Sequence, residues 1–169
     1  MGDTTTTAAE VATAIDEDLA NLRDQRVRAA MMSFRVAPPA PIRLAWDYGQ
    51  PGETFGGWLV FSDPRQRTGI AYCNQGFGPK NPWGLIATGE TCPSMGMDSG
   101  WFQRFMDAWF DSFSAADVPI WKVIRRSKDK SARELITGEL SWQEAWDIIN
   151  RLRQEDPAHR YDCEHDISY

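Results

Sequence analysis

The sequence predicts an α+β protein, and three observations lead to this prediction. A helical apolar pattern opens the chain, four short extended segments follow between turn residues, and a strand–strand–helix–strand pattern closes it. A chain of 169 residues is long enough to bury a core without a covalent staple. We therefore expect a disordered Thr-rich N-terminus over residues 1–7 and a single domain over 8–169, with a candidate boundary between sub-units near 115–119.

The first predicted helix runs from Ala8 to about Ser33. Apolar residues recur at intervals of three and four on one helix face, first at Val11, Ile15, Leu19 and Leu22 and then, after a small drift, at Val27, Met31 and Phe34. The segment Val-Ala-Pro-Pro-Ala-Pro at 36–41 should end this helix, because prolines cannot donate the hydrogen bonds of a helical backbone.

Four extended segments come next, at residues 42–48, 55–61, 69–73 and 83–88. The first of them alternates, with Ile42, Leu44 and Trp46 on one face. The connections contain the glycines, prolines and aspartates that favour turns. An antiparallel meander of about four strands is the simplest arrangement.

A strongly aromatic segment follows the meander. Asp98 or Ser99 is a suitable helix cap, and the next apolar residues fall at helical spacing: Phe102, Phe105, Met106, Trp109, Phe110 and Phe113. This stripe predicts one aromatic helix that covers the sheet, and core packing is preferred over a ligand site.

The last third predicts a β-β-α-β unit. Residues 120–126 alternate as a strand, residues 132–137 form its return, and 160–168 form the closing strand. Between them, Ser141 and Glu144 have the spacing of a helix capping box. This unit either extends the first sheet or stands beside it.

The charge and cysteine content narrow the class of protein. The net charge of −6 argues against a chain-wide basic surface for nucleic acid or an anionic membrane, and no segment has the roughly 20 apolar residues of a membrane helix. The three cysteines are an odd number without repeated spacing, and no apolar leader precedes them. We expect a cytoplasmic protein with reduced thiols, and a Cys73–Cys92 disulfide is the alternative in an oxidising compartment.

The segment from Cys73 to Gly84 joins the third and fourth strands and is dense in glycine and proline. It lacks the glycine-lysine spacing of a phosphate-binding loop. The preferred interpretation is a rigid turn with Phe77 and Trp83 folded back on the core. The functional alternative is a recognition loop, in which four side chains are displayed to a partner: Phe77, Lys80, Asn81 and Trp83.

The C-terminal segment contains both histidines of the chain beside a cysteine. Cys163 and His165 are two residues apart, so on a strand they share a face and suit a metal such as zinc. Cys73 and Cys92 are candidates for the two missing ligands. The preferred alternative is a solvated tail without metal.

Residues 122–133 form a basic segment. The candidates for contact with phosphate are Lys122, Arg125, Arg126 and Lys128. The preferred alternative is an edge hairpin whose charges oppose aggregation, and nucleic acid is therefore not an expected partner.

No nucleophile–base signature is present, so no catalytic residue and no cofactor is predicted. The leading hypothesis is a small non-enzymatic binding protein of the inhibitor, immunity or adaptor type, which recognises a protein partner through aromatic and Gly-Pro loops. Two alternatives remain open. One is a metal-binding or hydrolytic enzyme that uses Cys163 and His165, and the other is a nucleic-acid contact through the hairpin 122–133.

Overall fold

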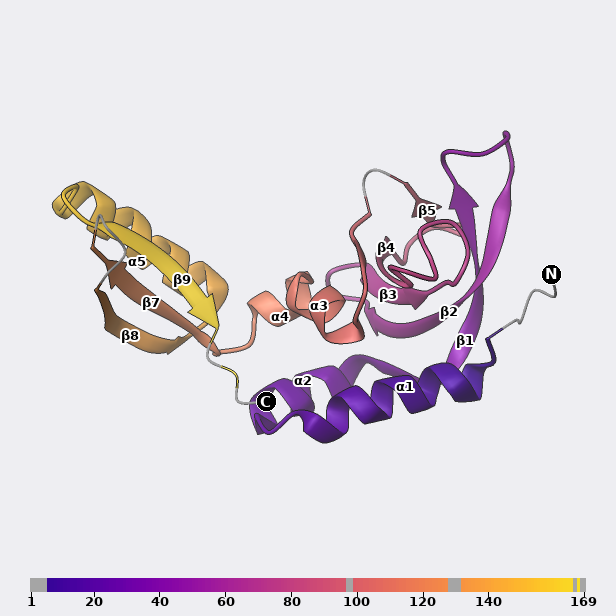
Figure 1. Ribbon diagram of the computed structural model, residues 1–169, viewed down its shortest axis with the longest axis horizontal. Helices are drawn as coiled ribbons and strands as arrows, with labels where there is room; N and C mark the ends of the chain where they lie inside the picture. Colours follow the sequence, from indigo (N-terminus) through magenta and orange to yellow (C-terminus); the bar gives the residue numbers. More distant parts are fainter. Residues whose placement is uncertain (1–5, 97–98, 128–131, 166, 168–169) are drawn as a thin grey trace. The chain divides into compact units, whose positions relative to one another are not determined.

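The computed structural model describes residues 6–96, 99–127, 132–165 and 167, and it has the predicted α+β fold (Figure 1). The chain divides into two compact units, where the sequence predicted one domain. Unit 1 comprises Met1–Asn21 and Met31–Ser114, and unit 2 comprises Leu22–Ala30 and Ala115–Tyr169. The long stretch of unit 2 begins at Ala115.

The predicted first helix is two helices, α1 (Ala8–Asn21) and α2 (Gln25–Phe34). The break follows from Asp24, whose carboxylate accepts hydrogen bonds from the backbone amides of Arg26 and Val27 and so caps a new helix. The predicted apolar stripe is buried from Val11 to Met31.

Thr6 and Thr7, which the sequence assigned to a disordered start, are held in place. The carbonyl oxygen of Thr6 accepts a hydrogen bond from the Trp58 indole. Thr7 caps α1, because its hydroxyl oxygen accepts from the amide of Glu10 while the Glu10 carboxylate accepts from the amide of Thr7. The rest of the predicted segment lies outside the described residues.

Unit 1 contains a six-stranded sheet in the order β5-β1-β2-β3-β4-β6. Its strands are β1 (Arg35–Trp46), β2 (Thr54–Asp63), β3 (Thr68–Tyr72), β4 (Trp83–Ala87), β5 (Ser94–Met95) and β6 (Trp101–Phe102). The first four are antiparallel neighbours, which confirms the predicted meander. β5 pairs parallel to β1, and β6 pairs antiparallel to β4.

Helix α2 ends at Phe34, directly before the proline segment 36–41, as the sequence predicts. The proline segment itself lies inside β1, which begins directly after α2. The β1–β2 register shifts between Arg35 and Ala40, and this irregularity accommodates Pro38 and Pro39, which have no amide to donate to the ladder. The prolines therefore interrupt the pairing of a strand that continues to Trp46.

The two faces of this sheet are covered differently. Helix α1 contacts β1 and β2, and α3 (Phe105–Phe110) contacts β4, where the Phe105 and Trp83 rings meet edge to face. The opposite face carries a buried cluster that includes Leu44, Cys73 and Met95. The segments that cover this second face are connections between strands, and the candidate site is built on them.

The predicted aromatic helix is wrong as a single element. Trp101 and Phe102 pair with β4 as a strand, and two short helices follow, α3 and α4 (Phe113–Ala116). Asp98 lies outside the described residues, and the Ser99 hydroxyl bonds with Gly96 instead of capping a helix. The prediction of core packing holds at Phe105, Met106 and Trp109, which are buried, whereas Phe113 is 66% exposed.

Unit 2 contains the predicted β-β-α-β unit with a sheet of its own. The elements are β7 (Trp121–Arg126), β8 (Arg133–Leu140), α5 (Trp142–Glu155) and β9 (Arg160–His165). The strands are antiparallel in the order β8-β7-β9, and α5 packs on one face through Ala145 and Ile149. Ser141 and Glu144 form the predicted capping box. Among the helices of the described ranges, none is long and apolar enough to cross a membrane.

Candidate binding site

The connection between β3 and β4 is a closed turn. The amide of Cys73 donates to the carbonyl of Pro82 at 2.8 Å, and the amide of Gly78 donates to Gln75. Gly76 has a φ of +62°, and a Cβ atom there would lie 2.7 Å from the Met95 sulfur. Both observations require glycine at this position. The path of the loop is therefore set by its own hydrogen bonds and by its contact with the sheet face.

This turn places Phe77 at the centre of five aromatic rings. We call this set the aromatic cluster: Trp46, Tyr48, Phe55, Phe77 and Trp101. The Phe77 centroid lies 5.1 Å from that of Trp46 and 5.8 Å from those of Tyr48 and Trp101. Tyr48 is 53% exposed, so one face of the cluster is open to solvent.

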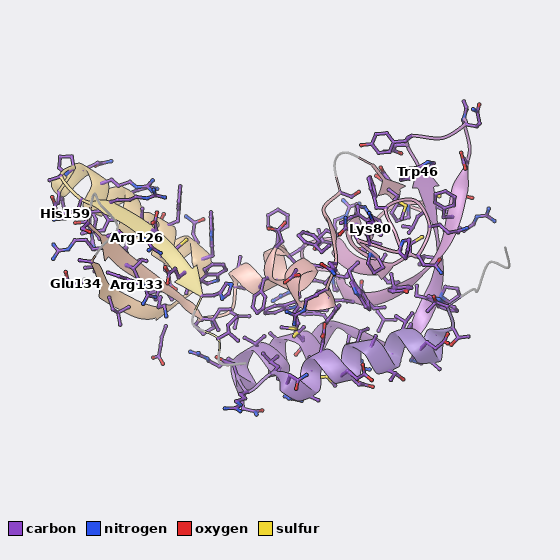
Figure 2. The ribbon with its side chains drawn as sticks, in the orientation of Figure 1. Trp46, Lys80, Arg126, Arg133, Glu134 and His159 are labelled. Carbon is purple, nitrogen blue, oxygen red and sulfur yellow. The ribbon has the colours of Figure 1, made fainter. Side chains whose placement is uncertain are left out.

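The four side chains predicted for a recognition loop differ in their burial. Trp83 is 6% exposed and packs against Phe105, so its ring belongs to the core and is not displayed. Phe77 is half-buried within the aromatic cluster. Lys80 and Asn81 are exposed at the same turn, and Lys80 is labelled in Figure 2. The interpretation in which the aromatic rings fold back on the core therefore describes Trp83. Lys80 and Asn81 are the side chains of this set that are open to solvent.

Sequence reasoning missed Tyr48, the most open ring of the cluster. The alternation of Ile42, Leu44 and Trp46 continues to Tyr48 in the predicted strand 42–48, but the structure ends β1 at Trp46 and places Tyr48 in the turn that follows. An aromatic residue inside a glycine-rich turn is a signal for a surface contact.

Polar contacts attach the neighbouring segments to the cluster. The Ser94 hydroxyl donates to the carboxylate of Asp47 at 2.5 Å, which joins β5 to the turn that carries Tyr48. The Trp101 indole donates to the Ser99 hydroxyl oxygen at 2.8 Å. These bonds hold Tyr48 and Trp101 at the two sides of Phe77 without burying the outer face of Tyr48.

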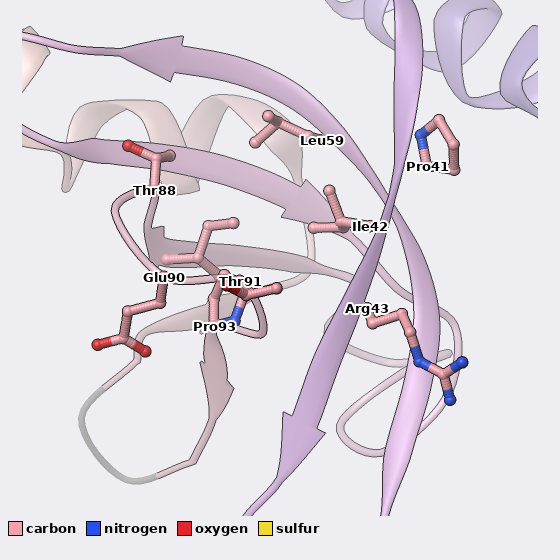
Figure 3. Close-up of a pocket in the computed structure, with 9 residues that line it drawn as sticks. Pro41, Ile42, Arg43, Leu59, Thr88, Glu90, Thr91 and Pro93 are labelled. Atoms are coloured by element: carbon pink, nitrogen blue, oxygen red, sulfur yellow. The ribbon is translucent and has the colours of Figure 1, made fainter.

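A pocket of about 390 Å³ lies on the same sheet face (Figure 3). Ile42, Leu59 and Ile86 supply apolar walls, and all three also pack in the cluster beneath the sheet face. Arg43 and Glu90 are the charged residues that line it. The pocket is suited to an apolar group with polar ends.

The predicted metal residues do not come together as a ligand set. Cys163 packs against the core beneath α5, and burial raises the pKa of its thiol. The His165 ring stands 5.7 Å from that of Trp121. In unit 1, the buried Cys73 thiol donates to the carbonyl of Gly56. Across the ranges that the structure describes, no three His, Cys, Asp or Glu residues form a group that could hold a metal.

The three cysteines are free thiols, so the alternative of a Cys73–Cys92 disulfide is not realised in this structure. Burial raises the pKa of the Cys73 thiol and keeps it protonated at neutral pH. This residue acts as a core side chain and is not poised as a nucleophile.

The basic segment forms the predicted hairpin, but its three arginines are paired with carboxylates. Arg125 binds Glu134, Arg126 binds Asp162 and Glu164, and Arg133 also binds Glu164. The Arg133 hydrogen bond, together with the charges of Arg126 and Lys122, lowers the pKa of Glu164. Lys128 lies outside the described residues. The sequence interpretation was an edge hairpin whose charges oppose aggregation. Of the two hairpin strands only β8 lies at an edge of the sheet, because β7 is the central strand.

Comparison with known proteins gives no relative: no family model, no curated protein and no solved structure matches this chain. The function is therefore argued from the geometry of the described residues.

Proposed function

We propose that this chain is a small non-enzymatic binding protein that recognises a protein partner through the aromatic cluster and the adjacent Lys80–Asn81 turn. The observation that carries the proposal is the half-exposed ring of Tyr48, supported from below by Trp46 and Phe77. Tyrosine and tryptophan are enriched among the residues that dominate binding energy in protein interfaces.

The rings beneath Tyr48 favour binding, because they restrict the motion of the Tyr48 ring before a partner binds. The Trp46 and Tyr48 centroids are 5.2 Å apart in an edge-to-face arrangement, so the tyrosine ring already has a fixed neighbour before any partner arrives. Immobilising a side chain at an interface costs free energy, and a preorganised ring avoids part of that cost. The exposed Lys80 adds a charge that selects an acidic or polar rim on the partner.

A cytoplasmic location is part of the same proposal. The free thiols support it, since cysteines in reducing compartments stay unpaired.

The test begins with affinity purification of the tagged chain from its native cells and identification of co-purifying proteins. Each candidate is then purified and its dissociation constant measured by calorimetry. We expect Tyr48→Ala to weaken binding at least tenfold, and Lys80→Ala to weaken it less, with melting temperatures within about 2 °C of the parent.

Met32→Ala is the matched control, because Met32 is also exposed, is apolar, and lies outside the aromatic cluster. It should bind as the parent does. A purified partner that binds Tyr48→Ala and Phe77→Leu as tightly as the parent would contradict the proposal.

A further inference from the structure

A second cavity of unit 1, of about 500 Å³, has a consistent chemical character. It lies between the end of β4, the segment around Ser99, and the turn that joins α3 to α4. Its apolar walls include Leu85, Ala87 and Phe113, and its two charged residues are Glu90 and Asp111.

The charges of this cavity have one sign. Glu90 and Asp111 are both exposed, and no described residue forms a hydrogen bond or an ion pair with either carboxylate. Among the described residues that line the cavity there is no lysine, arginine or histidine. Ser94, also in the lining, donates its hydroxyl proton to a third carboxylate, that of Asp47. The charged residues that line this cavity are therefore both negative, and the neighbouring cations Arg43 and Arg67 are not part of its lining.

The exposed ring of Phe113 fits the same chemistry. At 66% exposure it is a large apolar side chain that the core does not use, and it lines the cavity beside Ser112 and Asp111. The face of an aromatic ring attracts a cation, and its surface also accepts an alkyl chain. Two free carboxylates and an open ring around an apolar wall are complementary to a positively charged group on an apolar stem.

We infer that this cavity binds an organic cation with an apolar stem, of the kind presented by a primary alkylamine or a lysine side chain. The ammonium group lies near Glu90 and Asp111, and the stem lies along Leu85 and Phe113. The inference is independent of the aromatic cluster, because it uses none of the residues of that cluster.

The experiment is an amide NMR titration of the full chain with n-butylamine and with n-butanol, which has the same stem without the charge. We expect n-butylamine to bind with shifts at residues 85–87 and 111–113, and to bind more weakly as salt is raised. Binding of n-butanol should be at least tenfold weaker. Equal affinity for the amine and the alcohol would overturn the inference.

A double variant, Glu90→Gln with Asp111→Asn, keeps the shape of the cavity and removes its charge. It should lower the affinity for n-butylamine at least tenfold, while Glu155→Gln, an exposed carboxylate on α5, should leave it unchanged. Both variants replace exposed side chains, and the amide spectrum shows whether each remains folded. Unchanged affinity in a folded double variant would also overturn the inference.

Two further ligands identify the source of the cation, and each result would support the site. N-acetyl-lysine methylamide that binds more tightly than n-butylamine indicates a lysine side chain of a protein. Tighter binding of n-butylamine indicates a free amine. N-acetyl-norleucine methylamide is the neutral match for the lysine derivative, and it should bind at least tenfold more weakly.

Discussion

Asp63 shows at the scale of a residue how one buried charge is stabilised. Its carboxylate is fully buried at the end of β2, where it accepts hydrogen bonds from the amide and guanidinium of Arg65 and from the Ser114 hydroxyl. The Arg65 hydrogen bonds outweigh the effect of burial and lower its pKa from 3.8 to about 2.

This pKa predicts how stability depends on pH. Because the folded pKa of Asp63 lies below the unfolded value of 3.8, its contribution is complete above about pH 4 and is lost as the pH falls towards 2. We expect Asp63→Asn to lower the free energy of unfolding by about 2 kcal/mol at pH 7 and to flatten the loss between pH 4 and 2. Urea unfolding followed by tryptophan fluorescence measures both quantities.

Ser114→Ala is the companion variant, because it removes one hydrogen bond and leaves the ion pair with Arg65. Its effect at pH 7 should be smaller than that of Asp63→Asn. If Asp63→Asn and the parent lose the same free energy of unfolding between pH 4 and 2, this carboxylate does not control the loss of stability in acid.

Gly76 is the second residue whose identity the structure explains. With a φ of +62° and the Met95 sulfur and Trp46 ring close by, it has no room for a side chain. Gly76→Ala should lower the free energy of unfolding by about 1–3 kcal/mol, from backbone strain and displaced neighbours. Thermal unfolding measures this change. Gly56→Ala is the control, since a Cβ atom there meets nothing within 4 Å, and a comparable loss in both variants would contradict the explanation.

At the scale of an element, α5 depends on a local signal at its start. The Ser141 hydroxyl oxygen accepts from the amide of Glu144, and the Glu144 carboxylate accepts from the amide of Ser141 at 2.8 Å. These two contacts satisfy amides that the helix itself leaves unpaired. The Glu144 carboxylate also accepts a hydrogen bond from the Ser141 hydroxyl, and this bond, together with the one from the Ser141 amide, lowers the pKa of Glu144.

Removal of the cap should weaken the helix and the core that it covers. We expect Ser141→Ala to lower the free energy of unfolding of unit 2 by about 1 kcal/mol, as measured by urea unfolding followed by circular dichroism. Gln143→Ala changes an exposed residue in the same turn and should have little effect. If Gln143→Ala lowers the free energy of unfolding as much as Ser141→Ala does, the loss comes from substitution in this turn and not from removal of the cap.

At the scale of the whole molecule, unit 2 includes a segment from the N-terminal part of the chain. Residues Leu22–Ala30 belong to unit 2, although they lie among residues of unit 1 in the sequence. Within unit 2, the Arg26 guanidinium donates to the carbonyl of Pro119 at 2.9 Å, and Leu22 and Val27 are buried. Residues 22–30 therefore add buried side chains and a hydrogen bond to unit 2, while the buried cluster between its sheet and α5 consists of residues from β7, α5 and β9.

This organisation predicts how fragments behave. A fragment of residues 115–169 should melt at a lower temperature than a fusion of residues 22–30 to it through a flexible linker, because the fusion restores the Arg26–Pro119 hydrogen bond and the burial of Leu22 and Val27. The same fusion with Leu22→Asp and Val27→Asp should melt no higher than the fragment, because it restores the chain length without the apolar side chains. Equal melting temperatures for the fragment and the fusion would contradict the assignment of this segment to unit 2.

The sequence alone determined the features that depend on neighbours along the chain. Helical spacing from Val11 to Met31, alternation in the meander and the Ser141 capping box are local patterns, and each appears in the structure. The break at Asp24 could also be predicted from the sequence, since aspartate is a preferred helix N-cap that accepts hydrogen bonds from the first backbone amides of the helix. Phe77, Lys80 and Asn81 were named for the candidate site because glycine and proline mark their turn.

Only the tertiary structure decided which distant residues meet. The helical spacing predicted from Phe102 onward does not hold at Phe102 itself, because Trp101 and Phe102 pair with β4, and a pairing partner elsewhere in the chain leaves no trace in local periodicity. The same holds for the burial of Trp83 and for the placing of Tyr48 beside Phe77. It holds also for the carboxylates that neutralise Arg125 and Arg126 and for the helical segment that completes unit 2. Contacts of this kind depend on the packing of whole elements, and that packing is a property of the folded chain.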